Sequence, residues 1–337
     1  MPNLNIFAYM RTAVATTIIA ASASFYAMPA TAAEFVMKIG TPTINDPIHR
    51  FAVRYGEVLE ERSEGRISVT IFPSGQLGTM PAQVSNMQTG IQEALVAPAG
   101  FLGGLNKGFQ VTDAPGFFDD ADEAHTLINN PDFRDRYRSL GTSSGVTGVS
   151  LWIYGPHSYV STKETLSLAD LDGQKLRVLA TPMERAIVAE LGVTGVPMPF
   201  IEVLAAIQRG TVDGVRTMPA VMTPLKYFDT APYLLQVDDG ILTNGLWVSE
   251  MWLSSLPADL RTIVEETGVE VGDWATQMSK EAWTAALVEW TEKGGTVSTL
   301  SPEDKAAHFA ALRPIADKFL SEDAASAELW EILKGLK

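Results

Sequence analysis

Arg177 is the residue whose type and position point most directly to binding chemistry. It stands inside the segment 170–178 (DLDGQKLRV), where a turn ending at Gly173 is followed by a short apolar strand. A guanidinium held on a rigid strand suits bidentate capture of a carboxylate. An Arg in such a strand can also extend along a sheet edge or form an internal salt bridge, and the residue type alone does not choose between these roles.

Residues for enzyme chemistry are present but are not spaced for catalysis. His49, His125, His157 and His308 are far apart, and none has the H-E-x-x-H spacing of a zinc site. The chain has no cysteine, which excludes disulfides, thiol catalysis and thiolate metal ligands. The segment 141–145 matches G-x-S-x-G, but it follows a predicted helix and precedes a predicted strand, the reverse of a hydrolase elbow. We expect no enzyme activity, metal or cofactor, with an exported hydrolase as a less favoured alternative.

The N-terminus indicates export. Residues 1–33 carry a single charge, Arg11, followed by an apolar run of small residues over 12–25 and an A-x-A site before Glu34. This is the layout of a secretory signal peptide, and the apolar run is shorter than the ~20 residues of a comfortable membrane span. We predict cleavage near Ala33 and a soluble periplasmic protein, with a single anchoring helix as the alternative.

The charge of the chain excludes some partners. A formal net charge of −15 without a basic stripe is unfavourable for nucleic acid or an anionic membrane surface, and we expect neither. An anionic ligand would therefore need local positive groups.

About 300 residues without disulfides can build their own cores, usually as two domains. We expect a monomer.

The elements that must position Arg177 form two β/α sets. The first has strands at 34–40, 67–72 and 93–97, with helices beginning near Asp46 and Pro81. The second has strands at 159–161, 175–179, 193–197 and 212–217, with helices at 182–191 and 201–209. A polar helix at 122–140 and a strand at 146–154 lie between the sets, a long amphipathic helix covers 257–290, and Ser301 is a good N-cap for a last helix. This order predicts an α/β protein with a largely parallel sheet.

We divide the chain into a signal peptide and two lobes that share crossing strands. The signal peptide is 1–33. Lobe I is 34–154 plus about 243–282, and lobe II is 155–242 plus about 283–337. A cleft between two such lobes is a natural ligand site.

Several motifs, in their order and spacing, resemble one family over nearly the whole mature chain. They are 38–40 (KIG) followed by Pro47 and His49, 64–69 (EGRISV), 72–78 (FPSGQLG), Gly90, 170–178 (DLDGQKLRV), 197–203 (PMPFIEV) and 206–214 (AIQRGTVDG). Together they resemble the solute-binding proteins of tripartite ATP-independent periplasmic (TRAP) transporters, of the DctP type.

The resemblance implies a two-lobed periplasmic binding protein of the type II-like, Venus-flytrap kind, with a long helix spanning both lobes. It implies capture of a small organic acid between the lobes and delivery to the membrane permease subunits of a TRAP transporter. A sensing subunit that presents the same ligand to a signalling kinase is an alternative, because its binding lobes would look the same. We further expect the two lobes to close around the ligand, with a bend of the long helix at Gly268 or Gly272.

The resemblance also assigns binding residues. It implies that Arg177 binds the ligand carboxylate and that Phe200 lies against the ligand. At three other positions this chain departs from the family. Thr217 stands where members usually have Asn, His157 where some members have a second Arg, and Ala180 where another Asn is frequent. Because the pocket keeps one cation and loses polar groups, we expect a monocarboxylate with an apolar, aromatic or keto/hydroxy body.

Two alternatives concern the rest of the pocket. Trp152, Tyr154 and Trp247 stand on strands near the lobe boundary, where they would either stack on a ligand or belong to the core. A C4-dicarboxylate would fit if His157 or Arg216 supplied a second cation.

Overall fold

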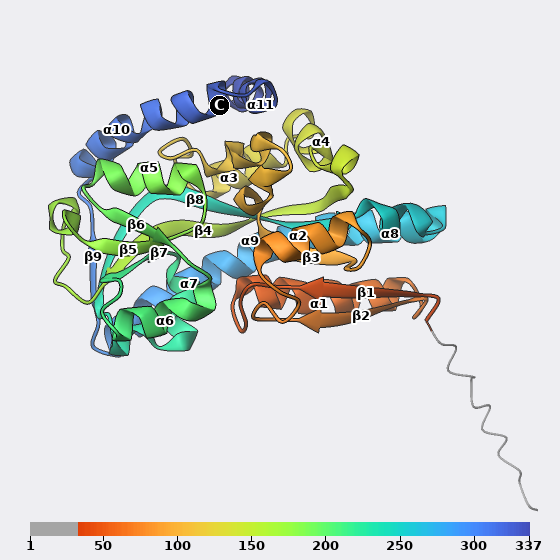
Figure 1. Cartoon of the computed structure of the whole chain (residues 1–337), viewed down its shortest axis with the longest axis horizontal. Coiled ribbons are helices and arrows are strands. Elements are labelled where there is room, and N and C mark those ends of the chain that lie inside the picture. The colour runs from red at the N-terminus through yellow and green to blue at the C-terminus, as the bar shows by residue number, and fades with distance from the viewer. Residues whose placement is uncertain (1–32) are drawn as a thin grey trace, which may run out of the picture. The chain divides into compact units, whose positions relative to one another are not determined.

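One mixed sheet runs through residues 33–337, the part of the chain that the computed structural model describes (Figure 1). The predicted signal peptide lies almost wholly outside these residues. The strands follow the order β2-β1-β3-β8-β4-β7-β5-β6, with β9 paired to β8. Their bounds are β1 Phe35–Gly40, β2 Ile67–Phe72, β3 Ala94–Pro98, β4 Val146–Ser161, β5 Lys175–Val178, β6 Thr194–Pro197, β7 Gly214–Thr217, β8 Tyr233–Ser249 and β9 Thr296–Thr299.

Helices cover both faces of this sheet. In Figure 1, α5 and α10 lie on one side of strands β5–β7, and α6 and α7 lie on the other. The α-helices are α1 Pro47–Arg62, α2 Met80–Gln88, α3 Ala121–Ile128, α4 Pro131–Ser139, α5 Pro182–Glu190, α6 Phe200–Gln208, α7 Pro219–Met222, α8 Glu250–Ser255, α9 Ala258–Glu292, α10 Pro302–Ser321 and α11 Ala324–Leu336. Two 3-10 helices, η1 (Ala99–Gly104) and η2 (Lys107–Asp113), follow β3.

The sheet has two parallel halves joined by two long antiparallel strands. In one half β1 pairs in parallel with β2 and β3, and in the other β5 pairs in parallel with β6 and β7. Strands β4 and β8 pair with each other and cross between the halves. They are buried along almost their whole length, as expected for strands covered on both faces.

The long helix α9 packs along β4 and contacts α1 on one half of the sheet and α7 on the other. Near its start, the backbone oxygen of Val264 accepts a hydrogen bond from the Tyr55 hydroxyl of α1 at 3.2 Å. Near its end, Trp290 Nε1 donates to Pro232 O, just before β8, at 2.9 Å. A Cβ on Gly268 would lie 2.4 Å from Val149 Cγ1 of β4. Glycine therefore lets α9 approach β4 closely, which gives Gly268 a packing role without any bend, and the bend stays a prediction.

The region expected to hold one polar helix, 122–140, holds two. Helix α3 ends at Ile128, and α4 begins at Pro131 after its N-cap Asn130, whose side chain accepts from Asp132 N at 3.0 Å. The prediction of a continuous helix was wrong because an Asn cap followed by Pro at the first turn starts a new helix. The G-x-S-x-G segment lies between α4 and β4, the order expected from the sequence.

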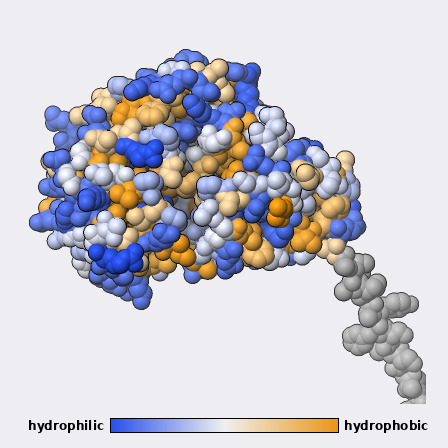
Figure 2. All heavy atoms as spheres, in the orientation of Figure 1, coloured by the Kyte–Doolittle hydropathy of each residue, from blue (hydrophilic) through white to orange (hydrophobic). Residues whose placement is uncertain are grey.

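The surface of this unit mixes polar and apolar residues. On the face in Figure 2, hydrophilic residues gather along the outer margin and paler or apolar residues lie toward the middle. Within residues 33–337, no helix has both the length and the apolar composition needed to cross a membrane.

Candidate functional site

A cavity of about 270 Å³ lies at the carboxyl ends of the parallel strands of both sheet halves. Loops that leave these strand ends form the usual ligand crevice of α/β sheets. The segments after β1, β2 and β3 line it from one half, and those after β5, β6 and β7 line it from the other. Apolar side chains dominate the lining: Pro42, Ile48, Met80, Pro81, Pro98, Phe101, Leu179, Ala180, Pro197, Met198, Pro199, Phe200, Ile201, Met218, Val221 and Leu242.

Arg177 is a cation in this cavity with an unused hydrogen-bond donor. Its side chain comes from β5 and is 3% exposed, and its Nε donates to Met198 O at 3.1 Å. Within residues 33–337, its Nη1 is buried and has no hydrogen-bond partner. Burial lowers the pKa of Arg177 to about 10, so the side chain is still charged at neutral pH. A buried charged donor without a partner is costly unless a ligand satisfies it.

Phe200 and Thr217 line the same cavity as Arg177. Phe200 is the first residue of α6, and its ring stacks on Tyr227 with centroids 5.8 Å apart and planes 12° apart. Thr217 ends β7, and its hydroxyl contacts the Met218 sulfur at 3.8 Å. The structure thus brings these three predicted residues together, and their contact with a ligand stays a prediction.

The two predicted tryptophans lie in the core and are not among the residues that line the cavity. Trp152 stacks between Phe51 and Tyr154, with ring centroids 5.5 Å and 6.0 Å away. Trp247 donates from Nε1 to Ala97 O at 3.0 Å and packs against other aromatic rings. Their positions favour the core alternative, whereas Tyr154 does line the cavity.

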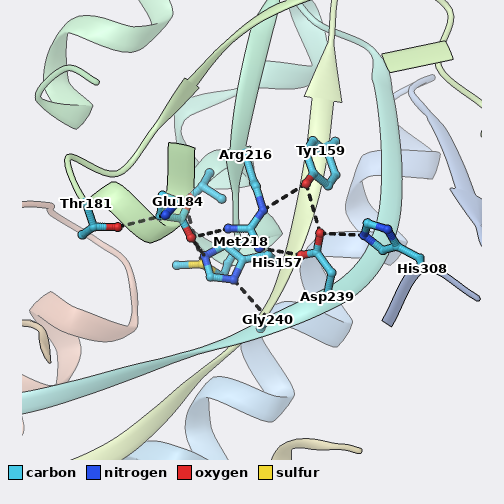
Figure 3. Close-up of polar contacts among 10 residues, drawn as sticks. His157, Tyr159, Thr181, Glu184, Arg216, Met218, Asp239, Gly240 and His308 are labelled. Carbon is cyan, nitrogen blue, oxygen red and sulfur yellow. Dashed lines mark hydrogen bonds and ion pairs between the residues drawn. The ribbon is translucent and has the colours of Figure 1, made fainter. Parts of the chain in front are cut away.

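Arg216 and His157 also lie away from the cavity lining, in a buried polar network (Figure 3). Arg216 donates from Nη1 to Glu184 and from Nη2 to Asp239 Oδ1, the second at 2.5 Å. His308 Nε2 lies 3.1 Å from Asp239 Oδ2. Burial by itself would raise the pKa of Asp239 and lower that of Arg216. The ion pairs outweigh this effect, so that Arg216 lowers the pKa of Asp239, and Asp239 and Glu184 raise the pKa of Arg216.

His157 is neutral at this position. Its Nδ1 lies 3.0 Å from Gly240 O, and burial together with the Arg216 charge lowers its pKa below the ordinary value. The dicarboxylate alternative needed a second cation from His157 or Arg216. In this arrangement Arg216 is paired with two carboxylates, and the lowered pKa of His157 favours its uncharged form.

A half-buried carboxyl group, Asp113, stands beside this network. It ends η2, and its Oδ1 is without a hydrogen-bond partner among the described residues. Burial and the nearby Glu184 carboxylate raise the pKa of Asp113 to about 8. The side chain is therefore largely protonated at neutral pH.

Asp46 is a cavity residue that the sequence analysis did not identify as one. It was predicted as the N-cap of α1, and its Oδ1 does accept from His49 N at 3.1 Å. It also lines the cavity beside Thr43 and Tyr154. Its position in the segment that joins β1 to α1, at the carboxyl end of a parallel strand, is the signal that could have revealed it.

Comparisons with known proteins give the class of this fold and site. The C4-dicarboxylate-binding periplasmic protein DctP of Rhodobacter capsulatus is 28% identical over 295 residues, which cover 86% of this chain and 88% of that protein. A TRAP periplasmic solute-binding protein from Desulfovibrio salexigens, solved with bound orotic acid, has a TM-score of 0.84 at 26% identity, covering 89% of this chain and 97% of that one. Another, from Ochrobactrum anthropi, has its C-terminus bound in the ligand-binding pocket; its TM-score is 0.79 at 28% identity, with 90% and 96% covered.

The fold is therefore that of TRAP periplasmic solute-binding proteins, and the predicted two-lobed α/β class is confirmed. Residues 40–323 match the family DctP, bacterial extracellular solute-binding protein, family 7. The chain belongs to this family, as its motifs predicted. The lobe boundaries stay predictions.

Proposed function

We propose that this protein is the periplasmic subunit of a TRAP transporter, that it captures a small monocarboxylate in the cavity around Arg177, and that it delivers the acid unchanged to the membrane permease. The observation that carries the proposal is the charged, buried guanidinium of Arg177, whose Nη1 has no hydrogen-bond partner within residues 33–337. A carboxylate oxygen is the natural partner for such a donor.

The surroundings of Arg177 support binding through a fixed donor. Its Nε is held by Met198 O and its guanidinium lies over the Phe200 ring, so the side chain is oriented before a ligand arrives. Preorganisation of this kind lowers the entropic cost of binding. The apolar lining supports a ligand whose body is largely apolar.

Two observations favour a ligand with one carboxylate over a ligand with two. Arg177 is the only Lys, Arg or His among the described residues that line the cavity. Arg216 is occupied by Glu184 and Asp239. A second ligand carboxylate would thus lose water without gaining a positive partner.

We further propose a closing cycle between the predicted lobes. The acid enters between lobe I and lobe II, Arg177 of lobe II binds its carboxylate, and closure brings residues of lobe I over its body. The ligand shifts the equilibrium only if it binds the closed state better than the open one. Export through the predicted signal peptide, with cleavage near Ala33, would place this cycle in the periplasm.

A thermal-shift screen of the chain beginning at Glu34 tests the proposal. The panel contains straight-chain and aromatic monocarboxylates, C4-dicarboxylates and sugar acids. A ligand at 100 times its dissociation constant adds about 2.7 kcal/mol of stability. We expect monocarboxylates to raise the melting temperature and to be recovered unchanged by mass spectrometry. A shift by dicarboxylates alone would contradict the single-cation site, and conversion of the acid would indicate an enzyme.

A further inference from the structure

Thr43, Asp46 and Tyr154 form a group of hydrogen-bond acceptors in the wall of the same cavity, here called the acceptor cluster. The hydroxyl of Thr43 donates to Asp46 Oδ2 at 2.8 Å, and the hydroxyl of Tyr154 donates to the same oxygen at 2.9 Å. Both hydroxyl protons are therefore used inside the cluster. What the three side chains can still offer a ligand is oxygen lone pairs.

Asp46 retains unused acceptor capacity. It is 1% exposed, and its carboxylate accepts three hydrogen bonds, from Thr43, Tyr154 and the backbone N–H of His49. An ionised carboxylate has about four lone-pair sites, so one remains. The three hydrogen-bond donors are neutral groups, and burial outweighs their effect and raises the pKa of Asp46. A further donor from a ligand would compensate this desolvation.

Asp46 and Arg177 come from different halves of the sheet that borders the cavity. Asp46 follows β1 and Arg177 stands on β5, and the sheet order places β3, β8, β4 and β7 between these strands. A ligand held by Arg177 at its carboxylate would therefore reach the cluster with a remote part of its body. A second carboxylate there would face the Asp46 carboxylate with like charge, whereas a purely apolar end would leave the remaining acceptor capacity of Asp46 unused.

We propose that the ligand is a monocarboxylic acid carrying a hydrogen-bond donor, a hydroxyl or an ammonium group, at the end remote from its carboxylate, and that Asp46 is the residue that selects this donor. This inference rests on the proposed function, because Arg177 must hold the carboxylate for the remote end to reach the cluster. It goes further in naming the second contact and the substituent that the ligand bears.

Isothermal titration calorimetry on the chain beginning at Glu34 tests the inference. The probes are pentanoate and its shorter and longer straight-chain homologues, each in the unsubstituted, ω-hydroxy and ω-amino form. We expect one substituted form of the best-fitting length to bind at least about tenfold more tightly than the unsubstituted acid. Whether the hydroxy or the amino form binds better identifies the donor.

Three variants separate an effect on the preference for the ligand's donor group from an effect on the stability of the protein. Asp46→Asn keeps an N-cap residue but adds an amide donor, and it should reduce the tenfold preference to about twofold or less. Tyr154→Phe leaves Asp46 in place and should change the preference by a smaller factor. Asp120→Asn, at the exposed N-cap of α3, is the matched control and should leave the preference unchanged.

The outcomes distinguish the inference from the proposed function. Equal binding of substituted and unsubstituted acids, lost in Arg177→Ala, overturns the role of Asp46 and leaves the carboxylate site intact. An unchanged preference in a folded Asp46→Asn protein also overturns it. If no acid of the series shows binding that depends on Arg177, both the inference and the proposed function are contradicted.

Discussion

The guanidinium carbon of Arg177 lies 5.5 Å from the centre of the Phe200 ring. The two residues come from neighbouring parts of one β/α unit, because Arg177 stands on β5 and Phe200 begins the helix that follows β6. Phe200 is itself stacked on Tyr227. The ring therefore presents a fixed face to the cation, and a desolvated contact of this type contributes about 2 kcal/mol. It orients the guanidinium while its Nη1 stays available to a ligand.

Close packing of α9 on β4 predicts the effect of substituting Gly268. A Cβ at this position would lie 2.4 Å from Val149 Cγ1 and 3.0 Å from Val149 O. We expect Gly268→Ala to lower the free energy of unfolding by about 1–3 kcal/mol, measured by urea denaturation. Gly335→Ala in α11, where a Cβ meets nothing within 4 Å, is the control and should be neutral or slightly stabilising. Equal effects at both glycines would contradict the packing role.

The buried network around Arg216 predicts a large stability loss when its cation is removed. Arg216→Met would leave Glu184 and Asp239 buried without their partner, at a cost of about 3–5 kcal/mol. The exposed pair between Arg136 and Glu328 provides the comparison, since Arg136→Met should change the stability by less than about 1 kcal/mol. Chemical denaturation of both variants measures the difference. Similar losses in the two would show that the network does not depend on Arg216.

Asp113 predicts a stability change between acid and mildly alkaline pH. Its pKa is raised from 3.8 to about 8 in the folded chain. A carboxyl group with a raised folded-state pKa stabilises the fold fully below its unfolded pKa, and this contribution is lost as pH rises through the folded value. Relative to Asp113→Asn, the wild type should therefore lose at least about 1 kcal/mol between pH 4 and pH 8. Parallel stability curves for the two proteins across this range would contradict the assignment.

Local signals in the sequence account for much of the fold. The strand–helix alternation before and after residue 150 predicted a largely parallel sheet. Parallel pairing is present within each half, but the antiparallel pairing of β4 with β8 and β7 was not predicted. Asp46 and Ser301 cap helices as expected. The prediction of one polar helix over 122–140 failed because the Asn130 cap and Pro131 begin a new helix there. Periodicity alone does not detect such a break.

Site residues could be predicted from the sequence where a motif coincides with the end of a strand. They could not be predicted where the role of a side chain depends on partners that are distant in sequence. Arg177 and Thr217 lie near the carboxyl ends of β5 and β7, and Phe200 begins the helix after β6; a β/α pattern places these positions at one edge of the sheet. Arg216 was considered as a free cation because its partners, Glu184 and Asp239, are distant in sequence. Asp46 was overlooked because capping of α1 already explained an aspartate there.

The central claim is that Arg177 binds the carboxylate of the ligand. Titration calorimetry of the best acid from the screen should be carried out on the wild type, on Arg177→Ala and on Arg209→Ala, whose arginine is exposed at the end of α6. Because hydrogen bonds to charged groups contribute about 1.5–3 kcal/mol each, we expect Arg177→Ala to weaken binding at least tenfold while the control binds as the wild type does. Unchanged affinity in a folded Arg177→Ala protein would contradict the account.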